Sequence, residues 1–135
     1  MRYMLDTNMI IYARNNRPEI VLEMFKRHRI EDMCLSAITL AELEYGIRNS
    51  RNYERNHLAL MTLLSGLVIM PFDETAAEEY GTIRSRLKKE GTMIGANDLL
   101  IADHARSRDL ILVTNNTREF ERVEGLKLEN WTLEQ

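Results

Sequence analysis

The sequence predicts an α/β fold: a three-layer α/β/α domain with a mostly parallel central sheet of four to five strands. Two observations carry this prediction. Short apolar segments that suit buried strands recur along the chain, and segments with helical periodicity separate them. Strands that alternate with helices form βαβ units, in which the strands run parallel and the helices cover the sheet. The length of 135 residues suits one domain over residues 1–135.

The first half of the chain is expected to form two strands and three helical segments. Residues 2–6 make the first strand, and a helical turn follows over residues 9–14. PEIVLEMFKRHR, residues 18–29, predicts a helix with proline at a favoured first position. MCLS, residues 33–36, is the second strand. Its serine is a good N-cap for a helix over AITLAELEYGIRNS, residues 37–50.

The second half is expected to continue the alternation. A helix over residues 53–65 precedes LVIMPF, residues 67–72, as the third strand. DETAAEEYGTIRSRLKKEG, residues 73–91, is a long amphipathic helix with acids in its first turns, basic residues in its last and glycine as its stop. NDLLIADHARSRD, residues 97–109, predicts a shorter helix, and LILVT, residues 110–114, the fourth strand.

The composition limits where the protein acts and how it could bind nucleic acid. A net charge of −3, from 18 basic and 21 acidic residues, requires any nucleic-acid surface to be local. Cys34 is the only cysteine, lies in an apolar segment and is expected to be buried, which fits a reducing compartment. No apolar run approaches the roughly 20 residues of a membrane span, and the N-terminus lacks the features of a secretory signal. We therefore expect a cytoplasmic protein without membrane contact.

Polar residues follow the expected strands where ligands bind in open parallel sheets, beyond the carboxyl ends of the strands. Asp6 ends the first strand, and Asn115 and Asn116 follow the fourth. Asp98 begins the apolar face of its helix, where it either stabilises the helix dipole or serves a site. Asp103 lies about 140° around the same helix and is expected to be a solvated charge.

Two acids lie in the apolar helix after the second strand, and helical periodicity does not choose between them. Glu42 and Glu44 each share a face with apolar neighbours. Carboxylate, amide and hydroxyl oxygens together suit Mg²⁺ or Mn²⁺. A zinc site is not expected, because the only cysteine is isolated and the histidines are scattered and expected at the surface. These histidines are His28, His57 and His104. Phosphate-loop and serine-nucleophile motifs are absent.

Four blocks in this order resemble the PIN-domain ribonucleases of the VapC toxin type over nearly the whole chain. They are MLDTN, SAITLAELEYG, IGANDLLIADHA and LILVTNNTREFERV. The resemblance implies metal-binding catalytic acids at Asp6, Glu42 and Asp98, and it selects Glu42 over Glu44. The family's fourth acidic position falls on Asn116, where many members have aspartate. Supporting polar groups are implied at Thr7, Asn8, Thr114 and Asn115.

The resemblance also implies a reaction and partners. The expected chemistry is Mg²⁺- or Mn²⁺-dependent hydrolysis of phosphodiester bonds in structured RNA, often tRNA. The proteins that this chain resembles are inhibited by a cognate VapB-type antitoxin, form homodimers, and contact DNA only through the antitoxin. RNA-binding residues must come from local basic clusters, which are Arg84, Arg86, Lys88 and Lys89, and separately Arg14. The alternative is a non-catalytic PIN-like partner that caps a DNA-binding antitoxin and tunes repression.

Overall fold

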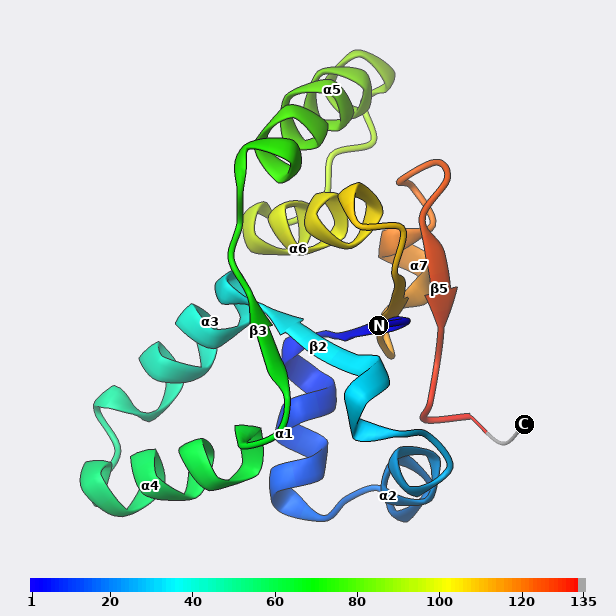
Figure 1. Ribbon diagram of the computed structural model, residues 1–135. Coiled ribbons are helices and arrows are strands. Elements are labelled where there is room, and N and C mark those ends of the chain that lie inside the picture. Colours follow the sequence, from blue (N-terminus) through cyan, green and yellow to red (C-terminus); the bar gives the residue numbers. More distant parts are fainter. Residues whose placement is uncertain (134–135) are drawn as a thin grey trace.

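A parallel sheet forms the middle layer of the computed structural model, which describes residues 1–133 (Figure 1). Within these residues the strand order is β3-β2-β1-β4-β5, and every neighbouring pair is parallel. The strands are β1 (Tyr3–Leu5), β2 (Met33–Ser36), β3 (Val68–Met70), β4 (Ile111–Val113) and β5 (Lys127–Glu129). The carboxyl ends of the strands therefore lie along one edge. This arrangement confirms the expected α/β class and its parallel sheet.

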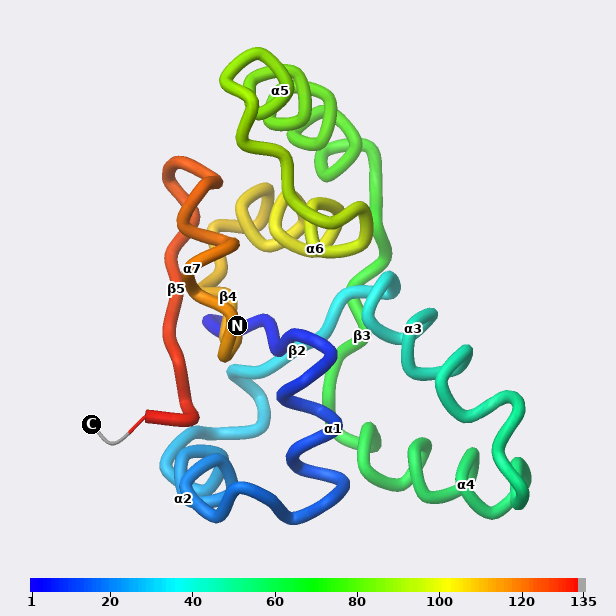
Figure 2. Tube along the Cα trace, turned by 180° about the vertical axis from the view of Figure 1, so that it is seen from behind, coloured from blue at the N-terminus to red at the C-terminus, as the bar shows by residue number. Residues whose placement is uncertain are grey.

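Helices cover both faces of the sheet, as Figures 1 and 2 show from opposite sides. One face carries α1 (Thr7–Asn15), α2 (Glu19–Lys26), α3 (Ala37–Arg48) and α4 (Tyr53–Leu64). The other carries α5 (Glu74–Glu90), α6 (Ala96–Ser107) and the short α7 (Thr117–Phe120). A 3₁₀ turn, η1 (Ile30–Asp32), leads into β2. No helix in the described part of the chain is both long and apolar enough to span a bilayer.

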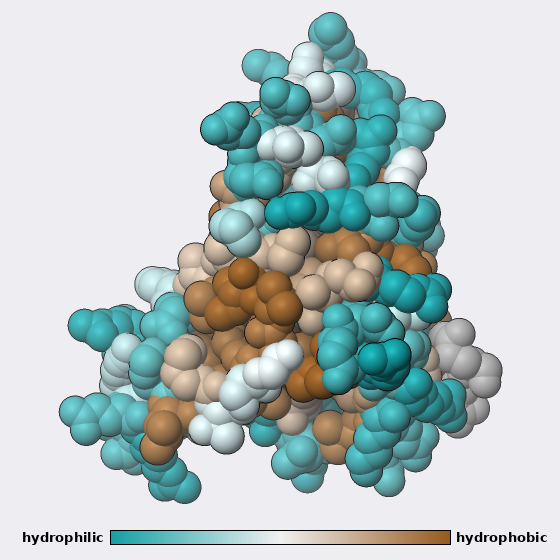
Figure 3. Space-filling model, viewed as in Figure 1, coloured by the Kyte–Doolittle hydropathy of each residue, from teal (hydrophilic) through white to brown (hydrophobic). Residues whose placement is uncertain are grey.

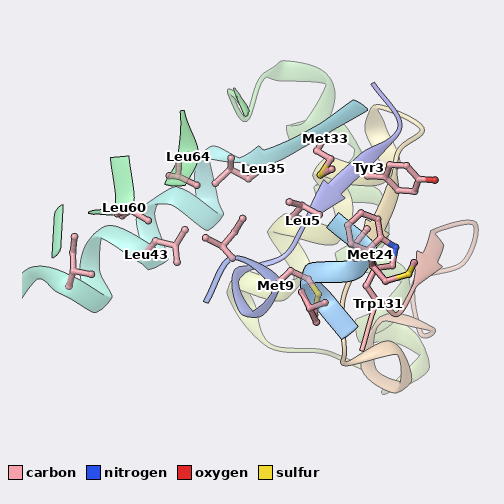
Figure 4. Packing of buried hydrophobic residues seen from close by; sticks show 14 residues of the cluster. Tyr3, Leu5, Met9, Met24, Met33, Leu35, Leu43, Leu60, Leu64 and Trp131 are labelled. Carbon is pink, nitrogen blue, oxygen red and sulfur yellow. The ribbon is translucent and has the colours of Figure 1, made fainter. Parts of the chain in front are cut away.

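The alternation of side chains along β1 divides the core into two clusters. Tyr3 and Leu5 point to the α1–α4 face, where they pack with Trp131 and the apolar faces of those helices (Figure 4). Met4 points the opposite way, into the cluster with α5 and α6. Cys34 joins this second cluster, and burial raises the pKa of its thiol to about 11. The expectation that Cys34 is buried is thus confirmed.

The helix boundaries follow local capping. Asp6 caps α1, so this helix begins at Thr7, two residues before the expected start. Pro18 occupies the N-cap of α2, one position earlier than predicted, and the helix ends at Lys26. Asp73 caps α5 and Gly91 ends it at φ +69°, a conformation that glycine adopts readily.

One edge of the sheet is apolar and uncovered. Val68 and Ile69 of the edge strand β3 are 44% and 40% exposed. Ile30 of η1, whose side chain lies beside Gly66 just before β3, is 45% exposed. Figure 3 shows a large apolar area in the middle of this face of the molecule, where β3 runs in Figure 1. An exposed apolar edge strand favours association with another chain.

The expectations for Asp103 and His104 were wrong, whereas His28 and His57 are partly exposed. Asp103 and His104 are fully buried on α6, because this helix is covered on opposite sides by the sheet and by α5. His28 is half-buried and stacks on Trp131 with ring centroids 4.6 Å apart. His57 is half-exposed and lies 3.1 Å from Glu44.

The buried carboxylate of Asp103 is electrostatically costly. Neither of its oxygens has a hydrogen-bond partner among residues 1–133. Burial raises its pKa to about 7, with a further increase from the negative charge of Glu79 and a smaller opposing effect of Arg106. Glu79 is itself engaged by Arg106 at 2.8 Å. Because an ionised carboxylate is costly at this buried position on α6, the stability of the protein should depend on pH.

We predict that Asp103→Asn removes a pH-dependent destabilisation. Because the pKa of about 7 exceeds the ordinary 3.8, the folded chain holds a proton that the unfolded chain has released. The free energy of unfolding of the wild type should therefore decrease as the pH rises from about 4 through 7. The free energy of unfolding of Asp103→Asn, relative to that of the wild type, should increase by about 2 kcal/mol between pH 5.5 and 8.5. Urea unfolding at both pH values measures this difference.

Asp109→Asn is the matched control, because Asp109 is exposed and its replacement leaves the buried carboxylate in place. The difference in the free energy of unfolding between Asp109→Asn and the wild type should be the same at the two pH values. Parallel pH profiles for the wild type and Asp103→Asn would contradict the prediction.

Candidate active site at the carboxyl edge of the sheet

Asp6 is held at the end of the central strand by its neighbours on two elements. Its backbone N–H donates to Val113 O at 3.0 Å, which continues the β1–β4 pairing, and its Oδ1 accepts the Met9 N–H at 3.0 Å. Burial raises the pKa of Asp6 to about 6, against the lowering effect of hydrogen bonds from Thr114 and Met9. The charge of Glu42 raises it further. Asp6 is thus a fixed, poorly solvated carboxyl group.

Glu42 reaches the same place from α3. Its Oε1 accepts a 2.6 Å hydrogen bond from the Thr7 hydroxyl, and its Oε2 accepts one of 3.3 Å from Asn97 Nδ2. Glu44, by contrast, lies 3.1 Å from His57 on α4. The structure therefore brings Glu42, and not Glu44, beside the first turns of α1 and α6.

Asp98 lies in the first turn of α6 among other acids. Burial raises its pKa to about 6, and the negative charges of Glu119, Glu42 and Asp6 add to this effect in that order. The strongest of these neighbours, Glu119, was not among the expected site residues. It lies on α7, three residues after Asn116. Helical periodicity could not indicate α7 or its Glu119, because a helix of four residues is too short to show a period.

Glu119 is clamped between two donors. Its Oε1 accepts the Gly95 N–H at 2.9 Å, and its Oε2 accepts Asn116 Nδ2 at 2.6 Å. The Asn116 backbone N–H donates to Thr114 Oγ1 at 3.0 Å. The amide at the family's fourth acidic position therefore orients a carboxylate in the next helical turn.

The remaining supporting groups form a polar chain at the rim. Asn8 Nδ2 donates to Asn115 Oδ1 at 3.2 Å, and Asn115 Nδ2 donates to the Tyr12 hydroxyl at 2.9 Å. Both asparagines are exposed, whereas Thr114 is fully buried beneath them. These contacts link the start of α1 to the segment after β4. They hold the two central strand ends in register around Asp6.

A buried hydrogen bond joins the two helices that carry Glu42 and Asp98. Ser36 Oγ accepts the Ile38 N–H at 3.0 Å, which caps α3, and it lies 2.7 Å from His104 Nδ1 on α6. Burial and the positive charge of Arg108 lower the pKa of His104, so the ring is neutral at neutral pH. When a neutral ring carries its proton on Nε2, its Nδ1 accepts a hydrogen bond from the Ser36 hydroxyl. One serine thus fixes the relative position of both helices.

The acids are neighbours, but they do not form a closed set of ligands. In the described residues, no three histidine, cysteine or acidic side chains are arranged to bind a metal ion. The carboxylates instead accept hydrogen bonds from Thr7, Asn97, Met9 and Gly95. The atoms that these acids could offer to a metal are all oxygens, and burial raises the pKa values of Asp6 and Asp98 to about 6. This set fits a hard divalent cation, which would replace mutual repulsion by attraction.

A cleft of about 530 Å³ opens beside these acids. Its lining combines polar groups of the site with apolar side chains of α3 and α6, namely Thr7, Ile38, Ala41, Glu42, Tyr45, Asn97 and Leu100. Tyr45 is 79% exposed, so its ring is available to a ligand. Exposed aromatic rings beside such clefts can stack on nucleic-acid bases.

The basic residues expected to bind RNA are not equivalent. Arg86 forms ion pairs with Glu124 at 3.0 Å and Glu90 at 4.0 Å, so neighbouring carboxylates offset its charge. Arg84 lies over the Tyr80 ring and donates to its hydroxyl. Lys88 and Lys89 are exposed at the end of α5. Arg14 lies apart from them, at the end of α1.

Comparison with known proteins places this geometry in a family. Residues 3–126 match the model of the PIN domain. Ribonuclease VapC2 of Haemophilus influenzae is 47% identical over 131 residues, covering 97% of this chain and 98% of that relative. The tRNA(fMet)-specific endonuclease VapC of Shigella flexneri is 45% identical over 132 residues, covering 98% and 99%. The chain belongs to the PIN-domain family and, within it, to the VapC ribonucleases.

Solved structures agree with this assignment. DNA-bound VapBC from Salmonella typhimurium matches with a TM-score of 0.91 at 44% identity, over 97% of this chain and 98% of that chain. VapBC2 from Rickettsia felis, bound to a promoter DNA fragment, matches with a TM-score of 0.88 at 40% identity, over 97% and 99%. The resemblance inferred from the four sequence blocks is confirmed.

We predict that Ser36→Ala destabilises the protein by about 1–2 kcal/mol, because α3 loses its cap and His104 loses its partner. Ser36→Thr keeps the hydroxyl and should recover part of this loss. Ser85→Ala, on the exposed side of α5, is the control and should change stability by less than about 0.5 kcal/mol. Thermal unfolding of the three variants decides, and an unchanged melting temperature for Ser36→Ala would contradict the prediction.

Proposed function

We propose that this chain is a Mg²⁺- or Mn²⁺-dependent endoribonuclease that hydrolyses phosphodiester bonds in structured RNA, tRNA above all. The observation that carries the proposal is the convergence of Asp6, Glu42 and Asp98 at the carboxyl edge of the sheet. The name of a relative, tRNA(fMet)-specific endonuclease, supports tRNA as the substrate. Glu119 adds a fourth carboxylate to this set.

The three acids would hold the cation together, with Glu119 facing it through water or directly. A bound Mg²⁺ or Mn²⁺ supplies Lewis-acid polarisation of the phosphate and lowers the pKa of its bound water. Hydrogen bonds from side chains and from the backbone of this protein orient the acids beforehand. The Thr7 hydroxyl fixes Glu42, the Met9 N–H fixes Asp6, and the Gly95 N–H fixes Glu119. Such preorganisation limits the rearrangement needed during the reaction.

Partners follow from the family and from the surface. We propose that a cognate VapB-type antitoxin inhibits the enzyme and that contact with DNA occurs only through it, because related structures are VapBC complexes with DNA. The exposed apolar edge of β3 supports a homodimer. A cytoplasmic location fits the tRNA substrate and the single buried thiol.

A non-catalytic role in tuning repression is the alternative. It predicts an incomplete acidic set, and Asn116 is the feature in its favour. Glu119 weakens this argument, because it brings a carboxylate to the same corner. Cleavage of a deacylated tRNA pool with Mg²⁺, compared with duplex DNA and with EDTA, separates the two functions. Sequencing of the new RNA 5′ ends then identifies the bond that is cut.

We predict that Glu42→Gln lowers the rate of tRNA cleavage by about 100-fold or more, because it removes a charge from the site. Asp98→Asn should have an effect at least as large. Glu44→Gln is the matched control and should stay within about twofold of the wild type, because Glu44 faces His57. An inactive Glu44→Gln beside an active Glu42→Gln would reverse the assignment.

We predict that Asn116→Asp lowers the stability of the metal-free protein and raises its affinity for a divalent cation. The change replaces the 2.6 Å hydrogen bond to Glu119 by two facing carboxylates, so the melting temperature in EDTA should decrease by a few degrees. Mn²⁺ should bind more tightly or with higher stoichiometry without RNA. Thermal unfolding in EDTA measures the change in stability, and calorimetric titration with Mn²⁺ measures the affinity and stoichiometry.

Glu119→Gln is the counterpart and should weaken Mn²⁺ binding without lowering stability in EDTA. If Asn116→Asp bound Mn²⁺ with the affinity and stoichiometry of the wild type, Asn116 would lie outside the metal site. Glu119 would then be the only residue that the segment after β4 contributes to the metal site.

A further inference from the structure

A second cleft, of about 460 Å³, lies between the end of α1 and the start of α4. It is lined by three arginines, three asparagines and one alanine: Arg14, Arg51, Arg55, Asn15, Asn52, Asn56 and Ala59. No carboxylate contributes to this lining. Six of the seven side chains carry N–H donors, so the cleft presents hydrogen-bond donors and positive charge.

The guanidinium groups of this cleft are not neutralised. Within residues 1–133, no ion pair involves Arg14, Arg51 or Arg55, and all three side chains are exposed. Other arginines of the chain do have partners, as Arg106 has Glu79 and Arg108 has Asp73. Three like charges around one cavity repel one another unless an anion binds there.

Hydrogen bonds stabilise the turn that carries Arg51 and the start of α4, which carries Arg55. Asn56 Nδ2 donates to Ser50 Oγ at 2.9 Å, and the Ser50 hydroxyl donates to Ile47 O at 2.6 Å. The Asn56 backbone N–H donates to Asn52 O at 2.9 Å, as the first turn of α4. These bonds fix the backbone on which Arg51 and Arg55 are presented, which lowers the entropy cost of binding an anion.

The cleft lies at the far end of the helices that lead away from the candidate active site. Arg14 is eight residues beyond Asp6 on α1, which is about 12 Å along the helix. Arg51 follows the end of α3, the helix that carries Glu42, and α1 and α3 pack together. Figure 2 shows α1 and α3 leaving the middle of the molecule and the turn before α4 at its periphery.

We propose that this cleft binds the phosphodiester backbone of the RNA substrate, a few nucleotides from the bond that is cut. The inference rests on the proposed ribonuclease function. Arginine forks match phosphate oxygens bidentately, and asparagine amides add neutral donors. At the 3.4 Å rise of a stacked strand, 12 Å corresponds to about three to four nucleotides. An acidic protein segment fits less well, because Ala59 is the only apolar contact that the cleft offers.

Arg51→Gln/Arg55→Gln tests the proposal in an Asp98→Asn background, in which we expect RNA to bind with little cleavage. Fluorescence anisotropy with a labelled, deacylated tRNA pool should show at least a tenfold loss of affinity at 100 mM salt. The slope of log K against log salt should decrease by about 1.4–1.8, which is 0.7–0.9 for each lost phosphate contact. Lys26→Gln/Arg29→Gln on the α2 side removes the same charge as a control and should leave both quantities unchanged.

Each outcome has a defined meaning. Arg51→Lys/Arg55→Lys keeps the charge but loses the fork, so it should retain the salt slope and lose part of the affinity. Unchanged tRNA affinity and slope in the glutamine variant would overturn the proposal, and so would a selective loss of antitoxin binding with tRNA binding intact. The failure of the ribonuclease function would differ, because the wild type would then not cleave tRNA while the binding measurements would still be interpretable.

Discussion

The carboxyl group of Asp6 ends the central strand and accepts the Met9 N–H at 3.0 Å, so one side chain both begins α1 and faces the candidate active site. Its backbone N–H also continues the pairing with β4. The position of α1 relative to the sheet therefore depends on the same group that the proposed chemistry needs. Burial raises the pKa of Asp6 to about 6, so the fold holds this carboxylate at a cost that a bound cation would relieve.

Hydrogen bonds from all sides organise the acids before any ligand arrives. Thr7 holds Glu42, Gly95 and Asn116 hold Glu119, and the Ser36–His104 pair ties α3 to α6. The Thr7–Glu42, Gly95–Glu119 and Ser36–His104 bonds connect elements that are distant in sequence, so the site and the packing of the helices stabilise one another. This coupling explains how repelling carboxylates are kept together in a chain of 135 residues.

The sequence allowed a good prediction of the central layers because β1, β2 and β4 are almost entirely apolar and the longer helices have caps or clear periodicity. It did not reveal β5 or α7, since the triplet KLE and the tetrad TREF are too short for a pattern. Glu119 was missed for this reason. Asp103 was misjudged because helical periodicity describes one apolar face, whereas α6 is covered on two. Periodicity also left Glu42 and Glu44 equivalent. The family resemblance selected Glu42, and the tertiary contacts now separate the two, with Glu42 beside Thr7 and Glu44 beside His57.

The charge distribution reconciles a net charge of −3 with an anionic substrate. The acids are concentrated at the carboxyl edge of the sheet, where they would repel RNA unless a cation intervened. Three arginines without an ion pair among residues 1–133 line the cleft between the far end of α1 and the start of α4. An RNA held there by its backbone would approach the acids as a tethered ligand, so its effective concentration at the site would rise even though the acids repel it. Binding and catalysis would thus be divided between two ends of the same pair of helices, and the cation would be needed only at one.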